Sequence, residues 1–178
     1  MESPTGSSSH LRALAHPVRL RILSLLTGAE LSAADVAREL GLTHANASYH
    51  LRFLLEAGEV VVSSEESIRG GRAKRYRHPW RPQDRPQPPQ AHPAGAEAVQ
   101  LVVRAGTEEL LRRARHRRPG IPGAFTDAEL WVDTATWQRA LALLDEASAV
   151  LHDGARPPRS EGTELVNLSL FAFVMDPA

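Results

Sequence analysis

The chain has 178 residues, 21 basic and 21 acidic side chains, and no cysteine. The lack of cysteine excludes disulfides, thiol catalysis and thiolate metal sites. With 42% hydrophobic residues and no apolar run of the roughly 20 residues that a membrane helix needs, the composition predicts a soluble, cytoplasmic protein of one or two small domains. The zero net charge argues against a nucleic-acid binder unless cations gather locally.

A proline-rich stretch divides the chain, because six of the fifteen residues in 79–93 are proline. Proline lacks a backbone N–H and favours extended conformations, so this stretch is predicted to be a stiff linker. Residues 10–78 before it form a predicted N-terminal domain, and residues 94–178 after it form a second module. The small, polar residues 1–9 show no secretion signal and are expected to be a disordered tail.

Capping residues and apolar spacing predict three helices in the N-terminal domain. The first covers 17–28, with proline at its start and glycine at its end. Ser32 and Asp35 predict a capping box for the second helix, which ends at residue 41. The third covers 43–56 and carries a polar exposed face. Two short helices joined by a glycine-containing turn, the second with such a face, indicate a helix-turn-helix.

The apolar period changes after the third helix. Residues 60–63 predict a strand, and residues 73–78 predict a returning strand with Tyr76 turned inward. Such a hairpin behind a helix-turn-helix is the wing of a winged-helix domain. Five cations and no acid lie in residues 69–77, so the wing is predicted to be a basic patch that the neutral net charge conceals.

These segments resemble the ArsR family of winged-helix bacterial transcription regulators. The resemblance covers residues 10–78 and is carried by ALAHPVRLRIL, ELSAADVARELGLTHANASYHLRFLLEAGEV and RGGRAKRYR. It implies a homodimer that reads a dyad-symmetric operator in double-stranded DNA and whose binding a signal releases or alters. Metal-sensing relatives carry a thiolate pair where this chain has Ser32 and Ala34, so we expect a member that senses no metal and uses no cofactor.

The third helix and the wing supply the predicted DNA contacts. Asn46 can pair bidentately with adenine, and Ala45 can contact a thymine methyl group. A solvated helix face, an ordinary charged hairpin and a half-buried His50 are the alternatives at these positions. The predicted DNA-binding residues are Thr43, His44, Ala45, Asn46, Ser48, Tyr49, His50, Arg52, Arg69, Arg72, Lys74 and Arg75.

The C-terminal module is predicted to contain helices over 94–115 and 134–152 and strands over 125–132 and 164–175. The first helix is the candidate dimerisation helix, and the last strand is apolar on both faces, which predicts cover on both sides. The fold class is therefore mainly α with a small β component: a winged helix-turn-helix domain, a helix, and a small α/β module for dimerisation or effector binding. Core or dimer packing is one reading of its aromatic residues, and an apolar effector pocket formed by Trp131, Trp137, Phe171 and Phe173 is the other.

We therefore predict a sequence-specific DNA-binding transcription regulator, acting as a dimeric repressor rather than an enzyme. A winged helix that serves as a protein-interaction scaffold is one alternative, and it predicts that changing Arg72 and Arg75 leaves DNA affinity unaltered. An enzyme fused to a winged helix is another. Asp127, Glu129, Asp133 and Asp145 supply carboxylates for it, but no histidine or nucleophile stands beside them in a recognised catalytic spacing.

Overall fold

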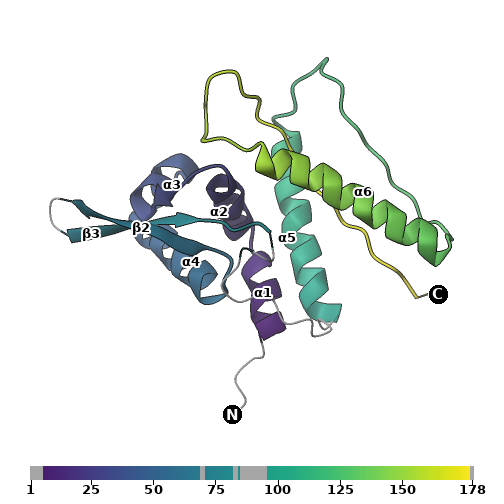
Figure 1. Ribbon diagram of the computed structural model, residues 1–178, viewed down its shortest axis with the longest axis horizontal. Helices are drawn as coiled ribbons and strands as arrows, with labels where there is room; N and C mark the ends of the chain where they lie inside the picture. The colour runs from purple at the N-terminus through teal and green to yellow at the C-terminus, as the bar shows by residue number, and fades with distance from the viewer. Residues whose placement is uncertain (1–5, 69–70, 82–83, 85–95, 177–178) are drawn as a thin grey trace, which may run out of the picture.

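The computed structural model describes residues 6–68, 71–81, 84 and 96–176. A winged-helix body is followed by two long helices, and none of the described helices is both long and apolar enough to cross a bilayer (Figure 1). This confirms the predicted class, mainly α with a small sheet. The elements are α1 (Gly6–Leu14), α2 (Pro17–Thr27), β1 (Leu31–Ser32), α3 (Ala33–Leu40), α4 (His44–Glu56), β2 (Val61–Ile68), β3 (Gly71–Arg77), α5 (Ala96–Ala114) and α6 (Thr134–Asp153).

The helix-turn-helix begins and ends at residues that satisfy the free backbone groups of its helices. The Ser32 hydroxyl accepts from the Asp35 N–H at 3.2 Å, and the Asp35 carboxylate accepts from the Ser32 N–H at 3.1 Å, which completes the predicted capping box of α3. Gly41 ends α3 in the left-handed region, at φ 65°. The Thr43 hydroxyl then accepts from the Asn46 N–H at 3.2 Å and caps α4. These contacts confirm the predicted boundaries of both helices.

The apolar core lies where α2, α3 and α4 meet. Ile22 of α2, Val36 of α3, and Leu51 and Leu54 of α4 are fully buried, and Tyr76 of β3 packs against this cluster. Burial of each such aliphatic side chain stabilises the fold by about 1.5–3 kcal/mol. The cluster therefore fixes how α4 is held relative to α3.

The sheet has the order β1-β3-β2 and is antiparallel throughout. Its hairpin is longer than predicted, because β2 continues to Ile68 instead of ending at residue 63. Glu65 of β2 lies opposite Lys74 of β3, and opposite charges across a strand pair favour pairing. The wing is therefore a long two-stranded ribbon that projects from the helical body (Figure 1).

The chain is helical earlier than the sequence indicates. Residues 6–9, assigned above to a disordered tail, form the first turns of α1, while residues 1–5 lie outside the described part. The helix is held by tertiary contacts, because it packs against α2 and α5, Ala13 is buried, and His10 pairs with the buried carboxylate of Glu59. Of the predicted linker 79–93, the structure describes only residues 79–81 and 84.

The C-terminal half differs most from its prediction. Both helices are present: α5 packs against α1 and α2, and α6 has no buried residue. The strands predicted over 125–132 and 164–175 do not form, since these residues are irregular and lie in no ladder with described residues. A strand needs a partner edge, and the sheet of the wing lies on the other side of α5 (Figure 1). The predicted α/β packing is thus absent from the single chain.

Candidate nucleic-acid interface

A tight turn and an apolar face fix the orientation of α4. The Leu42 N–H donates to the Ala37 carbonyl at 2.9 Å, so the chain reverses immediately after α3. Ala47, Leu51 and Leu54 then bury one face of α4 in the core. The opposite face points to solvent, and its exposed side chains are His44, Ala45, Asn46, Tyr49, Arg52 and Glu56.

The exposed face carries groups suited to base and phosphate contacts. Asn46 offers an amide that both donates and accepts, and Arg52 offers a fork of donors. Thr43 is exposed, but its hydroxyl already accepts from the Asn46 N–H, and Ser48 is half-buried. The structure thus brings His44, Ala45, Asn46, Tyr49 and Arg52 of the predicted set onto one outward face.

His50 lies on the other side of α4. It is 5% exposed, and its ring centroid lies 4.8 Å from that of His16. Burial lowers the pKa of His50, and the nearby His16 and Arg19 lower it further. His50 is therefore a neutral residue of the protein interior and does not reach DNA from this position. The spacing of Ala47, His50 and Leu51, which share one helical stripe, is the sequence signal that places it there.

A buried arginine beneath α4 was missed by the sequence analysis. The Arg19 Nε donates to the Ala13 carbonyl at 2.6 Å, a second guanidinium nitrogen donates to the Arg12 carbonyl, and the guanidinium stacks on the Phe53 ring at 4.4 Å from its centroid. Arg19 therefore joins the end of α1 to α4. Its position on α2 gives no periodic signal, because a cation on an amphipathic helix ordinarily faces solvent.

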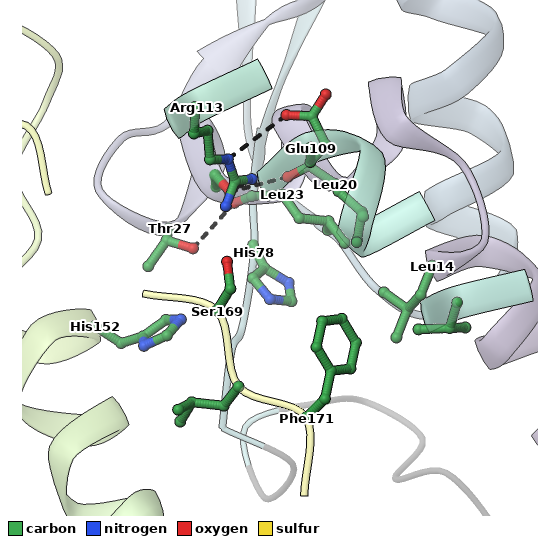
Figure 2. Close-up of a pocket in the computed structure, with 14 residues that line it drawn as sticks. Leu14, Leu20, Leu23, Thr27, His78, Glu109, Arg113, His152, Ser169 and Phe171 are labelled. Carbon is green, nitrogen blue, oxygen red and sulfur yellow. Dashed lines mark hydrogen bonds and ion pairs between the residues drawn. The ribbon is translucent and has the colours of Figure 1, made fainter. Parts of the chain in front are cut away.

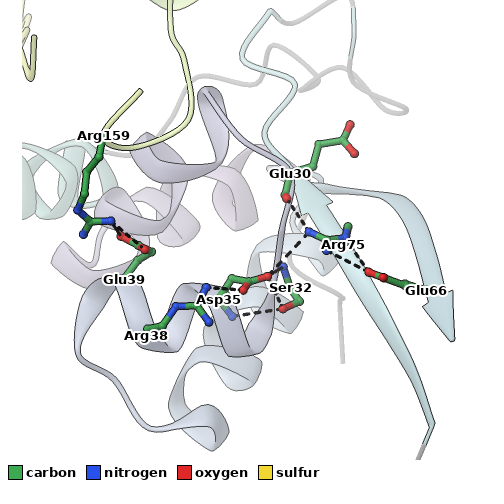
Figure 3. A network of polar contacts seen from close by, with 8 residues as sticks. All are labelled: Glu30, Ser32, Asp35, Arg38, Glu39, Glu66, Arg75 and Arg159. Atoms are coloured by element: carbon green, nitrogen blue, oxygen red, sulfur yellow. Dashed lines mark hydrogen bonds and ion pairs between the residues drawn. The ribbon is translucent and has the colours of Figure 1, made fainter. Parts of the chain in front are cut away.

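The wing cations are partly neutralised by acids on the opposite strand. Arg72 pairs with Glu65 at 2.6 Å. Arg75 contacts the Glu66 carboxylate at 3.0 Å and donates to the Glu30 carbonyl at 3.2 Å (Figure 3). The count of charged side chains over residues 69–77 does not include these acids, because they belong to β2. Lys74 and Arg77 are exposed, and the predicted contact Arg69 lies outside the described residues.

Arg75 also connects the wing to the start of α3. It lies 3.9 Å from the Asp35 carboxylate, whose pKa is lowered chiefly by the hydrogen bond from the Ser32 hydroxyl and also by Arg38. Figure 3 shows Arg75 between Glu66 of the wing and the Ser32–Asp35 cap. The side chain therefore links the wing to the start of α3, beside the pairing of β1 with β3.

A protein-family model described as a helix-turn-helix domain matches residues 14–61. The match runs from the end of α1 through α4 to the first residue of the wing. The chain contains a helix-turn-helix domain. In such a domain the second helix is the one that enters the major groove of DNA, and here that helix is α4. No curated protein matches the chain.

A cavity of about 250 Å³ lies between the helix-turn-helix domain and the C-terminal half (Figure 2). Leu20 and Leu23 of α2 line one side, and Phe171 lines another. Within it, Glu109 of α5 is almost fully buried and lies 3.6 Å from Arg113. The described residues hold no group of three or more side chains that could bind a metal ion.

The predicted effector residues are dispersed. Phe171 lines the cavity, whereas Trp131 is 90% exposed and Phe173 is also exposed. Trp137 is half-buried on α6. The structure therefore brings one of the four aromatic side chains to a cavity.

The loop after α6 touches the helix-turn-helix domain at two places. Arg159 pairs with Glu39 of α3 at 2.9 Å (Figure 3). The Arg156 backbone lies so close to Gly28, at the end of α2, that a side chain there would collide with the Arg156 carbonyl. The C-terminal half is thus in direct contact with the end of α2 and with α3.

Proposed function

We propose that this chain is a sequence-specific DNA-binding transcription regulator that acts as a homodimer on a dyad-symmetric operator. The observation that carries the proposal is the outward face of α4, where Asn46, Tyr49 and Arg52 are exposed on a helix whose opposite face is buried. The side chains that can read bases are thus free, while those that hold the helix are not. The adjoining wing offers Lys74 and Arg77 to the phosphate backbone.

A dimeric repressor of the ArsR type is the finer form of this proposal. Its support is the resemblance of residues 10–78 to that family and the arrangement of the wing directly behind the helix-turn-helix. In a two-fold dimer, the two copies of α4 enter successive major grooves about one helical turn apart. The neutral net charge then limits non-specific binding and leaves specificity to these contacts.

For a signal in the C-terminal half to release DNA, a movement there must reach α4. Two contacts of the loop after α6 support such a connection. Arg159 is paired with α3, and the loop backbone rests on Gly28. A signal that moves α6 would shift α3 and α4 through this loop, and a small change in helix spacing removes several DNA contacts together.

Selection of bound fragments from the source genome by the purified chain tests the function. We expect enrichment of a dyad-symmetric motif whose half-sites lie one helical turn, or a multiple of one turn, apart. An unchanged fragment pool at low salt would refute DNA binding. Enrichment of a motif without dyad symmetry would refute the dimer, while leaving the DNA contact in place.

A further inference from the structure

Two extended segments of the C-terminal half have apolar side chains but no partner strand. We call residues 122–132, between α5 and α6, the arm, and residues 164–176, after α6, the C-terminal segment. Neither makes a backbone–backbone hydrogen bond with any other described residue. In the arm, Phe125 is 93% and Trp131 is 90% exposed. Such side chains on an unpaired extended backbone are the features of a strand that pairs with another chain.

The helix between these segments is also only partly covered. The 20 residues of α6 include Trp137, Leu141 and Leu144 on one face, yet none is buried. Helices in water take most of their stability from the packing of an apolar face. The arm and the C-terminal segment lie on either side of α6 in Figure 1, so one covering surface could bury all three.

The C-terminal segment is already positioned against α5. Glu164 pairs at 2.7 Å with Arg118, which follows the end of α5, and Asn167 accepts from Arg113 of α5 at 3.1 Å. Further along, the Phe171 ring occupies the space beside Gly106 that a side chain would fill. The segment therefore runs along α5 in a fixed direction, and its backbone hydrogen-bonding groups remain available.

We propose that two copies of this chain exchange these segments, with the arm of each copy pairing with the C-terminal segment of the other. This rests on the proposed homodimer and specifies how it is built. Pairing of the C-terminal segment with its own copy across the two-fold axis would leave Phe125 and Trp131 of the arm exposed. Reciprocal exchange occupies both segments of both chains, and one two-fold axis relates the two pairings.

The exposed apolar surface is large enough for a stable dimer. An aromatic side chain offers roughly 150–250 Å², and a standard interface needs about 800 Å² from each partner. The large apolar side chains exposed in the two segments supply that area: Phe125, Leu130, Trp131, Val132, Leu165, Val166, Leu170, Phe171, Phe173, Val174 and Met175.

The chain has no cysteine, so introduced thiols report on the exchange without background. Ala128→Cys in the arm and Ala172→Cys in the C-terminal segment alter small side chains. Chains that carry one substitution each, with tags of different size, are mixed, refolded together and treated with a flexible bismaleimide in the absence of DNA. We expect a mixed crosslinked pair as the main product, and a doubly substituted chain crosslinked to a second copy.

Other crosslinking results would overturn the exchange. An internal crosslink in the doubly substituted chain would show that the arm pairs within its own copy. Self-crosslinking of Ala172→Cys alone would show pairing across the two-fold axis, and light scattering at the mass of a monomer would exclude a second copy as the partner. A dimer without the mixed crosslink would refute the exchange while leaving the proposed dimeric regulator intact.

A charge placed in the arm tests its contribution to the dimer. Trp131→Glu is expected to raise the dimer dissociation constant by at least about 30-fold, as loss of a central aromatic anchor does. Gln138→Glu places the same side chain on an exposed position of α6 and is expected to leave the constant unchanged. Equal dissociation constants for the two variants, measured by sedimentation with circular dichroism confirming the fold, would contradict the proposal.

Discussion

The proposed function gives Asn46 of α4 the role of distinguishing one base from another. It is exposed in the first turn of α4, and the N-terminal end of a recognition helix is the part that contacts base edges. A bidentate contact between asparagine and adenine discriminates by about 1–3 kcal/mol. The fixed N-cap at Thr43 holds the backbone from which this side chain projects.

We therefore predict that Asn46→Ala lowers affinity for the selected operator by between about 5-fold and about 150-fold, and relaxes the preference at one base pair of each half-site. Fluorescence anisotropy with the operator and its single-base variants measures both effects. Gln138→Ala, which also removes an exposed amide from a helix, is the control and should bind as the wild type does. Unchanged affinity of the Asn46 variant would remove this residue from the interface.

Neighbouring cations of the wing are predicted to behave differently. Lys74 is exposed, so Lys74→Ala should reduce the slope of log affinity against log salt by about one. Loss of the charge opposite Glu65 should lower the free energy of unfolding by only roughly 0.2 kcal/mol. Arg75 is held by Glu66 and the Glu30 carbonyl, so Arg75→Ala should lower the free energy of unfolding by roughly 1 kcal/mol. Salt titrations of operator binding and urea unfolding separate the two roles. A changed salt slope for Arg75→Ala together with the larger loss of stability for Lys74→Ala would contradict these two roles.

At the scale of elements, a pair of histidines joins α2 to α4. The His16 Nδ1 accepts from the Val18 N–H at 3.1 Å, and its ring lies beside that of His50. Burial lowers the pKa of both histidines, with Arg19 lowering both further and Glu108 partly opposing the shift at His16. Both imidazoles are therefore neutral in the folded protein at neutral pH.

The lowered pKa values of His16 and His50 predict that the protein loses stability in mild acid. Below pH about 6.5 the unfolded chain binds more protons than the folded chain, so the free energy of unfolding falls as the pH drops. Urea unfolding at pH 7.5 and 5.5 measures the fall, which should be smaller for His50→Gln than for the wild type. His44→Gln alters an exposed histidine of the same helix and should follow the wild type. An equal fall in all three proteins would exclude the pair as the cause.

Local signals were sufficient for most of the helices and for the wing. Ser32, Asp35 and Gly41 predicted the bounds of α3 because capping depends on neighbours in the chain. The same reasoning could not find the role of Arg75, because its acidic partners lie on another strand. It also placed His50 with the DNA contacts, although the burial of that residue follows from the phase of α4 against the core.

At the scale of the whole molecule, Gly28 is the point where the C-terminal loop meets the helix-turn-helix domain. An added Cβ would collide with the Arg156 backbone, so Gly28→Ala must displace the loop while α4 keeps its sequence. If the loop sets the position of α3, operator affinity should change by several-fold. Glu161→Ala, at an exposed position of the same loop, is the control. Equal operator affinity for both variants would show that the loop does not influence DNA binding.

The C-terminal half shows why sequence patterns predicted strands that the single chain lacks. The alternating apolar residues of 164–175 signal a strand, but a strand forms only when another edge meets it. Phe125 and Trp131 remain exposed for the same reason. The pattern thus predicts which residues suit a sheet, whereas strand pairing depends on a partner edge that the described part of the single chain does not supply.

Hydroxyl-radical footprinting of the wild-type chain on its selected operator tests the central claim most directly, since it reports the contacts of α4 and the two-fold arrangement together. We predict two equivalent protected regions whose centres lie about 10 base pairs apart, or a multiple of that distance. Protection should weaken together in both regions for Asn46→Ala. A single protected region at full affinity would contradict the dimeric reader, and no protection at any concentration would contradict DNA recognition by α4.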